Sequence, residues 1–423
     1  MKKWFIVMMF LFTFLLTGCT KKIKELDFKQ TKNFQTLNEV TYPDQQYLSY
    51  YDIDGGIVAS DFNYLQKFAN DTSKLLFVNS ENYIYSPMSL YMALGMLAQG
   101  AEGQTLDELL LLLQGNTIKT LDDINIDMNN IYNHNFYSNK DGMARMANSI
   151  WINKTFSVKN DFLEDLKTNY YAEVYHTNFN DEGKENIAEW INHYTENLLN
   201  IKKDNYPISE NTALMLINTV YFDNKWEEEF KTKDNFFDSF YGDNITNVEY
   251  MKHTNGSTYF EYENCEIFYD YFKNNNCIKF IFPKENSSVE ECLNSDMIGK
   301  ILNYEDGVNV ELTLSIPKFK TNSSYTLNDV LSNLGLNSIF NDGANFSKIS
   351  DNDLYVSFVK QDAGIILNEE GVKAAAVTGI GMVESAAPGE NISIILNRPF
   401  IYVITDSHNV PLFVGVVNNP TYK

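Results

Sequence analysis

The side chains that could support catalysis or metal binding are few and scattered in this chain of 423 residues. Its five histidines lie in no recognisable metal-binding or catalytic-triad context. The nucleophile motif GxSxG and the zinc motif HExxH are both missing from the sequence. The sequence therefore predicts that the protein is not an enzyme, and it indicates no metal and no cofactor.

Cysteines offer the other route to reactive chemistry. After Cys19, only Cys265, Cys277 and Cys292 remain, and they form no CxxC pair. An odd number without that motif indicates neither a disulfide framework nor a zinc site. Two alternatives stay open, namely one local disulfide among the three or three buried free thiols.

The amino-terminal residues have the pattern of an export signal. Lys2 and Lys3 precede the apolar run 4–16, which is short for a membrane span. The run ends in Leu-Thr-Gly-Cys19, which resembles a bacterial lipobox. The resemblance implies a signal peptide over residues 1–18, a lipid on Cys19, and attachment to the cell membrane outside the cytoplasm, or release to the extracellular space. A plain signal peptide with a chance cysteine is the alternative.

A further unusual stretch, Glu369–Thr378, follows the strand-like run Val356–Leu367. Between residues 372 and 382, alternate residues are mainly apolar, and the intervening ones are smaller on average and include the one charge, Lys373. This alternation is typical of a strand with one apolar face. Because a Gly-, Ala- and Ser-rich segment without regular periodicity follows, we interpret the stretch as a loop that is able to become a strand. An Ala/Gly-rich surface loop is the alternative.

The elements that must position this loop follow from periodicity. Residues 19–55 are predicted to be a lipidated cysteine and a polar spacer, and residues 56–423 a single globular unit. Thr105 and Glu108 predict a capping box at a helix start. Helices are expected at Val58–Asn70, Leu90–Gln99, Thr105–Leu113 and Ile187–Leu199. Strands are expected at Leu214–Phe222, Ile267–Tyr271, Ile278–Phe282, Val308–Ile316, Ile392–Leu396 and Ile401–Thr405. Helices early and strands late predict an α+β fold with a large mixed sheet.

Composition narrows the classes of partner. The net charge of −23 and the pI near 4.6 argue against nucleic-acid binding and favour solubility or basic partners. The 44% of hydrophobic residues is ample for a substantial core.

Several motifs in a fixed order resemble those of the serpin family. They include Asn82-Tyr-Ile-Tyr-Ser-Pro-Met-Ser-Leu90, Ile217-Asn-Thr-Val-Tyr-Phe222, Ser315-Ile-Pro-Lys-Phe319, Asn397-Arg-Pro-Phe400 and Pro411–Pro420. Independently of that resemblance, Ser86 and Ser89 suit the exposed amides of a helix start, and Pro87 suits its first turn.

The resemblance implies a serpin fold with a large central mixed sheet, additional sheets, about eight to nine helices and an exposed reactive-centre loop. It also implies a function: trapping a target serine protease as a covalent acyl-enzyme by insertion of the cut loop into the sheet. The implied partner is an extracellular protease, and the implied state is a monomer. Three alternatives remain, namely a non-inhibitory serpin-fold binding protein, an inhibitor of papain-like cysteine proteases, and a lipoprotein that binds solutes, although the repeated βαβ halves expected of the last are missing.

The resemblance assigns roles to particular residues. The reactive bond is expected between Ser385 and Ala386, with Glu384 and Ala387 as alternatives because the loop register differs by about three residues when it is counted back from Pro399. A small residue before the bond favours elastase-like or subtilisin-like targets. The hinge is expected to comprise Glu370, Gly371, Val372, Ala374, Ala375, Ala376 and Thr378. The residues where the strands of the sheet part are expected to be Ser86, Ser89, Asn218 and Gln361, with Trp226 at the upper opening of the sheet. Gln361 replaces the family's frequent histidine and is expected to hydrogen-bond Asn218 or Ser86.

Overall fold

The structure is a computed structural model that describes residues 35–43, 62–77, 81–115, 118–206, 208–303, 307–372 and 390–422. This described part of the chain contains nine α-helices and two large sheets, which confirms the predicted α+β class. The helices are α1 (Asn63–Leu76), α2 (Pro87–Gly100), α3 (Gly103–Gln114), α4 (Leu121–His134), α5 (Asn160–Tyr170), α6 (Asp181–Tyr194), α7 (Val289–Asn294), α8 (Met297–Asn303) and α9 (Asn328–Asn333).

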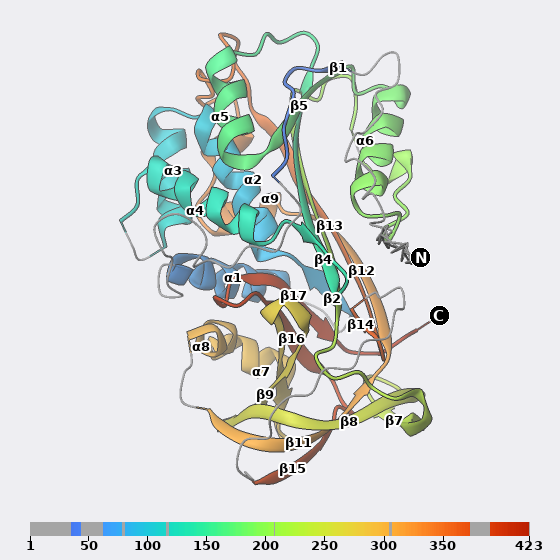
Figure 1. Cartoon of the computed structure of the whole chain (residues 1–423). Helices are drawn as coiled ribbons and strands as arrows, with labels where there is room; N and C mark the ends of the chain where they lie inside the picture. Colours follow the sequence, from blue (N-terminus) through green and yellow to red (C-terminus); the bar gives the residue numbers. More distant parts are fainter. Residues whose placement is uncertain are drawn as a thin grey trace, which may run out of the picture.

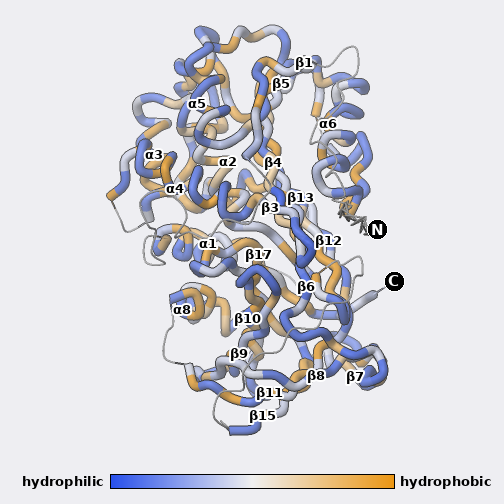
Figure 2. Tube along the Cα trace, viewed as in Figure 1, coloured by the Kyte–Doolittle hydropathy of each residue, from blue (hydrophilic) through white to orange (hydrophobic). Residues whose placement is uncertain are grey.

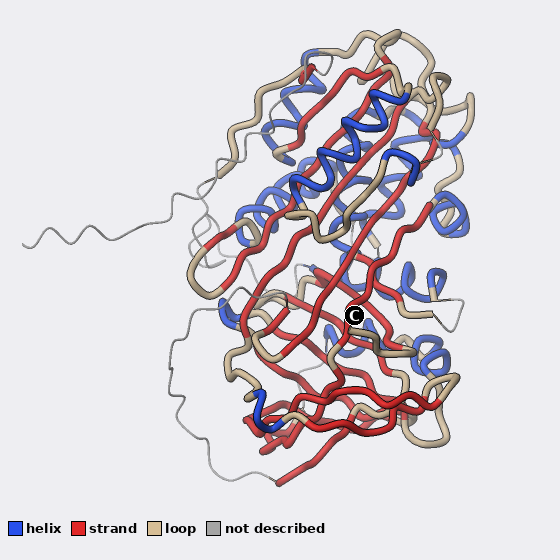
Figure 3. The backbone as a smooth tube through the Cα atoms, turned by 90° about the vertical axis from the view of Figure 1, so that its right-hand side faces the viewer, coloured by secondary structure: helices blue, strands red, loops and turns tan. Residues whose placement is uncertain are grey.

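The first sheet, called sheet A here, has the strand order β1-β5-β4-β6-β14-β13-β12, with β3 beside β4. Its strands are β1 (Gln35–Thr36), β3 (Tyr137–Ser138), β4 (Gly142–Asn153), β5 (Ala172–Thr177), β6 (Leu214–Lys225), β12 (Phe319–Thr326), β13 (Val356–Asn368) and β14 (Gly371–Val372). Helices α2 to α5 cover one face of this sheet, and α6 lies across the other (Figures 1 and 3). Most residues of α5 and α6 are hydrophilic, as expected of covering helices (Figure 2).

The second sheet, called sheet B here, has the order β15-β11-β8-β9-β10-β16-β17-β2, with β7 beside β8. Its strands are β2 (Tyr83–Tyr85), β7 (Phe236–Tyr241), β8 (Ile245–Tyr262), β9 (Cys265–Tyr271), β10 (Cys277–Pro283), β11 (Val308–Pro317), β15 (Asn391–Ile395), β16 (Phe400–Thr405) and β17 (Pro411–Val417). The six strands predicted from the sequence are all present, each within a few residues of its predicted ends.

Helix α2 forms the centre of the molecule. All of its residues are buried, so it is apolar on every side rather than amphipathic. The side chain of Ser86 caps its first turn by accepting a hydrogen bond from the backbone N–H of Ser89, and Pro87 occupies the first helical position. The helix start predicted from these three residues is therefore confirmed.

The capping box predicted at Thr105 and Glu108 is wrong. Helix α3 begins two residues earlier, after Glu102, and has no side-chain cap. Both predicted capping groups bind another segment: Thr105 Oγ1 accepts from the backbone N–H of Asn345, and the Glu108 carboxylate accepts from the N–H of Ser338 at 2.9 Å. Tertiary contacts thus use side chains whose spacing alone suggested a local role.

Residues 35–43, which lie in the stretch interpreted as spacer, are packed against the folded unit. Strand β1 extends sheet A by pairing with β5, where residue 36 lies opposite Tyr175. The Asn38 side chain donates to the carbonyl oxygen of Ala172 and accepts from the N–H of Val174, both at 2.9 Å. Tyr42 stacks on Phe136, with ring centroids 5.7 Å apart. The spacer lacked periodicity because side-chain hydrogen bonds and one aromatic contact, rather than an apolar stripe, hold this segment.

Candidate functional site at the opening of sheet A

The first hinge residues already lie inside sheet A. Strand β14 pairs with β6, where Gly371 lies opposite Lys225 and Val372 opposite Asn224, and it also pairs with β13, where Val372 lies opposite Leu367. Val372 is buried in the main hydrophobic core. The predicted loop therefore begins as a short antiparallel strand wedged between two long ones.

Glycine is required at position 371. Its φ is +146°, and a Cβ built there would lie 2.1 Å from the carbonyl oxygen of Asn224 and 2.8 Å from the Cα of Lys225. Any side chain would collide with the backbone of β6, and the positive φ would add strain. Gly371 thus turns the chain sharply from β13 into the sheet.

Beyond β14, the two flanking strands pair directly. Strands β6 and β13 are parallel there, with Asn218 opposite Gln361 and Leu214 opposite Val356. Between that ladder and β14, residues 219–223 of β6 and 362–366 of β13 are not paired with each other in the described structure. The sheet is therefore parted over five residues of each strand, immediately ahead of the hinge.

A buried polar network crosses the end of this parted region that is farther from β14, where β6 and β13 begin to pair. Gln361 makes two hydrogen bonds to the backbone of Ser86: its Oε1 accepts from the N–H at 2.8 Å, and its Nε2 donates to the carbonyl oxygen at 2.9 Å. Ser89 Oγ donates to Asn218 Oδ1. Of the two partners expected for Gln361, the structure therefore selects Ser86.

The same network continues to β4 through Asn148, a residue that the sequence analysis missed. Asn218 Nδ2 donates to Asn148 Oδ1, and Asn148 Nδ2 donates to the carbonyl oxygen of Tyr170 at 2.7 Å. The available signal was an amide among the mostly apolar residues 146–152 of β4. Because buried amides need partners, these contacts tie α2, β4, β6 and β13 together where the sheet would open.

Trp226 lies at the end of the parted region that adjoins β14. It is fully buried and stacks on Phe272 with ring centroids 4.5 Å apart. Its indole Nε1 donates to the carbonyl oxygen of Asn368 at 2.8 Å, and its backbone N–H donates to that of Glu370 at 3.2 Å. Trp226 thus holds both sides of the turn that precedes Gly371.

A charged cluster around Glu369 also holds the turn between β13 and Gly371. Lys318 Nζ lies 2.6 Å from a Glu249 carboxylate oxygen and 3.2 Å from Glu369 Oε1. Asn235 Nδ2 donates to both carboxylates, at 2.8 Å and 2.6 Å. Burial raises the pKa of Glu369, but the hydrogen bonds from Asn235 and Lys318 outweigh it and hold the pKa below its usual value. Lys318 belongs to the motif Ser315–Phe319, but the sequence analysis predicted no role for it.

The connection after α6 is fastened to β13 across the outer face of sheet A. The Tyr206 hydroxyl donates to Asp362 Oδ2, while Asp362 Oδ1 has no hydrogen-bond partner among the described residues. Lys360 Nζ donates to the carbonyl oxygen of Asn205 at 2.8 Å and lies 4.6 Å from the centre of the Tyr206 ring. Burial raises the pKa of Tyr206, and the Asp362 carboxylate raises it further. Asp362 is the first of the unpaired β13 residues, so this tie lies over the parted region.

The remaining predicted site residues lie outside the described residues. These are Cys19, Ala374, Ala375, Ala376, Thr378, Glu384, Ser385, Ala386 and Ala387. The structure describes the chain again from residue 390. Strand β15 begins at the next residue and pairs in parallel with β11 at the edge of sheet B. The hinge and the expected end of the loop therefore lie in different sheets.

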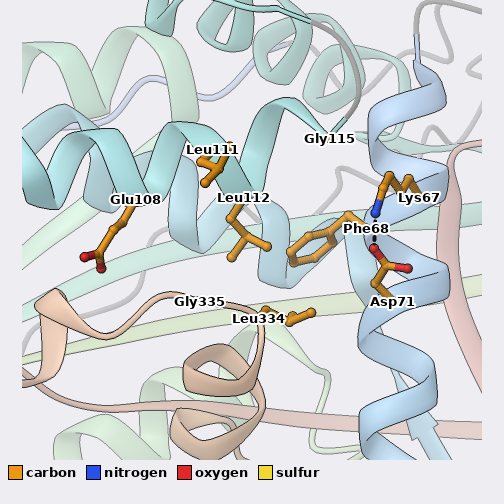
Figure 4. Close-up of a pocket in the computed structure, with 9 residues that line it drawn as sticks. All are labelled: Lys67, Phe68, Asp71, Glu108, Leu111, Leu112, Gly115, Leu334 and Gly335. Carbon is orange, nitrogen blue, oxygen red and sulfur yellow. Dashed lines mark hydrogen bonds and ion pairs between the residues drawn. The ribbon is translucent and has the colours of Figure 1, made fainter.

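Two further kinds of functional feature are missing from the described residues. No group of three or more metal-ligating side chains occurs among them, and none of their helices is long and apolar enough to cross a membrane. A cavity between α1, α3 and the segment that follows α9 has a volume of about 170 Å³. Of its three charged lining groups, Lys67 and Asp71 pair with each other, and Glu108 accepts from the backbone N–H of Ser338 (Figure 4). This volume is below the range of about 300–1,000 Å³ typical of small-molecule sites.

Comparisons with known proteins agree with this geometry. The family model described as "Serpin (serine protease inhibitor)" matches residues 63–420. Alpha-1-antiproteinase S of Cavia porcellus is 29% identical over 358 residues, which cover 82% of this chain and 86% of that protein. The native crystal structure of the thermophilic serpin tengpin has a TM-score of 0.78 and 29% identity, and the match covers 89% of this chain and 97% of that one. Thyroxine-binding globulin in complex with thyroxine has a TM-score of 0.74 and 25% identity, with 85% and 99% covered.

Proposed function

Because the chain belongs to the serpin family of serine protease inhibitors, we propose that it traps its target protease covalently by inserting its cut reactive loop into sheet A. The observation that carries this proposal is the position of β14 between β6 and β13, directly next to the stretch over which these two strands are parted. Loop insertion would extend a strand that has already begun.

The register of β14 predicts where the following residues would lie. Continued without a shift, Lys373–Val377 would lie opposite residues 219–223 of β6 and 362–366 of β13, the stretch that is unpaired. Thr378 would then meet Asn218 and Gln361, where direct pairing begins. Five residues would therefore enter without breaking a pair between β6 and β13, and each further residue would have to separate one.

The same register assigns faces to these side chains. Ala374 and Ala376 would share the face of Val372, next to Ile365 and Phe222, which belong to the main hydrophobic core. Small apolar side chains suit that face because packed interiors resist added volume. Lys373 would lie on the opposite, outer face.

The proposed reaction starts at the bait bond. The catalytic serine oxygen of the protease attacks the carbonyl carbon of Ser385, the bond to Ala386 breaks, and the new amino terminus leaves with a proton. The protease is then held as an ester on Ser385 while the freed segment enters sheet A. Insertion carries the enzyme away and distorts its active site before water releases it. The inhibitor supplies no catalytic group, since fold energy drives the trap.

The residues around the bait bond support a target class. The run Val383-Glu-Ser-Ala-Ala387 has no arginine or lysine, which disfavours trypsin-like enzymes. A small residue before the bond favours elastase-like or subtilisin-like serine proteases, and cleavage after Glu384 would favour a Glu-specific enzyme. A papain-like cysteine protease is the alternative target.

We also propose that the mature protein begins at a lipidated Cys19 and faces outside the cytoplasm, because the apolar run and lipobox-like residues support export. A lipid anchor would keep the inhibitor at the cell surface, where secreted proteases arrive. Labelling of intact cells with radioactive palmitate tests this proposal, and loss of label in Cys19→Ala is expected. Equal labelling of that variant would contradict it.

A non-inhibitory role is the second candidate, because the thyroxine-binding globulin complex is among the similar structures. The two candidates separate at the hinge, since only trapping needs insertion. Purified residues 20–423 should be mixed separately with elastase, subtilisin, trypsin, a Glu-specific protease and papain. A complex that survives denaturant, with cleavage near Ser385, is expected with elastase or subtilisin.

A matched pair of variants tests the insertion step. Ala374→Arg places a charge on the core face and is expected to turn the inhibitor into a substrate that is cut without forming a complex. Lys373→Arg adds the same side chain one position away, on the outer face, and is expected to trap normally. Unchanged trapping by Ala374→Arg would refute insertion, whereas cleavage of the unmodified protein without any complex would favour the non-inhibitory role.

A further inference from the structure

Two of the three cysteines after Cys19 lie side by side in the fold although they are distant in the sequence. Cys265 is the first residue of β9, and Cys292 lies in α7. Both have no exposed surface and belong to one hydrophobic cluster, separate from the main core. Cys292 Sγ lies 4.0 Å from the carbonyl oxygen of Asn264, the residue directly before Cys265.

The local structure fixes this approach. The turn before β9 is closed by a hydrogen bond of 2.8 Å from the N–H of Lys284 to the carbonyl oxygen of Asn264. Helix α7 starts shortly after that point, with Ser288 and Glu291 forming a capping box. The proximity of Cys292 is the main cause that raises the pKa of Cys265, and the proximity of Cys265 is the main cause that lowers the pKa of Cys292.

Cys277 is excluded from this pair by the register of the sheet. It lies opposite Tyr271, whereas Cys265 lies opposite Pro283 at the other end of the same two strands. Six residues along a strand correspond to roughly 20 Å, far beyond the separation of about 7 Å between Cα atoms that a disulfide tolerates. Cys277 Sγ instead lies 3.2 Å from Thr405 Oγ1.

We propose that Cys265 and Cys292 form a disulfide under oxidising conditions and that Cys277 stays reduced. The structure has the reduced form, with all three described cysteines as free thiols. Of the pairings that the sequence left open, the fold brings only this one together. The bond would fasten α7 to β9 in sheet B, on the side of the molecule away from the parted strands of sheet A (Figure 1).

The oxidation requires a disulfide donor such as oxidised glutathione. The Cys292 thiolate attacks one sulfur of the donor and releases one glutathione thiolate, which takes up a proton. The Cys265 thiolate then attacks Cys292 Sγ and releases the second glutathione. Two protein thiols become one disulfide, and the donor is reduced to two thiols. Because both sulfurs are buried in the folded protein, the exchange is expected during folding, before α7 packs.

The test is a thiol map of residues 20–423. The protein is refolded with a glutathione mixture or with dithiothreitol, alkylated in denaturant without reduction, digested and analysed by mass spectrometry. The glutathione sample is expected to contain a Cys265–Cys292 cross-linked peptide and alkylated Cys277, and the intact protein should be two hydrogens lighter. Circular dichroism confirms that both samples are folded.

Three substitutions sharpen the map. Cys277→Ser should keep the cross-link, whereas Cys292→Ser and Cys265→Ser should each remove it and leave the other thiol alkylated. Three alkylated cysteines in the folded glutathione sample would overturn the proposal, as would a cross-link that contains Cys277. The map on the unmodified protein decides the question even if a variant fails to fold.

Discussion

The tie between Tyr206 and Asp362 predicts a brake on loop insertion. It joins the connection after α6 to β13 at the first unpaired residue of the parted region. A strand entering between β6 and β13 would have to pass beneath this connection, so the tie is expected to be broken in the transition state. The variant Tyr206→Phe removes only the hydroxyl group and keeps the ring under Lys360.

The magnitude follows from the surroundings of Asp362. The residue is 7% exposed, and its other carboxylate oxygen has no partner among the described residues. Leaving such an acceptor without its donor costs about 1–3 kcal/mol in the native state. If the tie is fully broken at the barrier, the activation free energy of insertion falls by the same amount. Since about 1.4 kcal/mol is a factor of ten, insertion should accelerate about 5- to 150-fold.

The assay compares two quantities in the same protein. Denaturant unfolding measures the loss of stability, and the rate of loop insertion after protease attack is followed by stopped-flow fluorescence of a label on the loop. Tyr269→Phe is the matched control, because its hydroxyl donates to the carbonyl oxygen of Ile301 in α8 and its ring lies beneath Lys279, in the hydrophobic cluster that is separate from the main core. A Tyr206→Phe variant that is destabilised but inserts at the normal rate would refute the reasoning.

Three further predictions concern the supports of the parted region. The pKa values of Glu249 and Glu369 are depressed in the folded protein, so their contacts stabilise the fold above about pH 4.5 and this stabilisation is lost as pH falls through the folded pKa values. Lys318→Met removes the cation of these contacts and should therefore lower the melting temperature at about pH 7. The difference in melting temperature from the parent should shrink below about pH 4. Gln361→His should make stability fall more steeply than in the parent as pH drops below about 6.5, because a further buried neutral imidazole must become charged on unfolding, in addition to His176, whose pKa burial lowers in both proteins; equal pH profiles from denaturant unfolding would contradict this. Asn38→Ala should cost about 1–3 kcal/mol in denaturant unfolding, because it leaves the N–H of Val174 and the carbonyl oxygen of Ala172 unpaired; no loss would mean that residues 35–43 do not stabilise the sheet.

Sequence reasoning succeeded where a residue's role is set by its nearest neighbours. The start of α2 needed only Ser86, Pro87 and Ser89, which satisfy amides within one turn. The strands of sheet B were visible because their burial produces continuous apolar runs. The serpin family itself was predicted from short motifs in a fixed order, and the family match confirms it.

Sequence reasoning failed where a polar side chain had several possible hydrogen-bond partners within reach. The spacing of Thr105 and Glu108 suggested a capping box, yet both side chains bind backbone groups more than 200 residues away. Asn148 and Lys318 act through partners on elements distant in the sequence, and neither partner set is encoded by local spacing. Cys265 and Cys292 are the same case, because only the register of β9 against β10 separates their pairing from the other two.

The depth of the parted region connects these findings to the proposed trap. Extension of β14 through Val377 would breach no pairing of β6 with β13, and Ala374 and Ala376 suit the core face. The next residue would meet Asn218 and Gln361, which are held by Ser89 and by the backbone of Ser86. The first five residues would therefore enter the sheet without breaking a pair between β6 and β13, whereas each later residue would have to break one. The barrier to this later insertion lies in the buried hydrogen bonds of Asn218 and Gln361 rather than in the size of the inserting side chains. Because the chain beyond the loop is held in sheet B by the pairing of β15 with β11, we expect cleavage near Ser385 to release the inserting segment from that tether and to commit the molecule to full insertion.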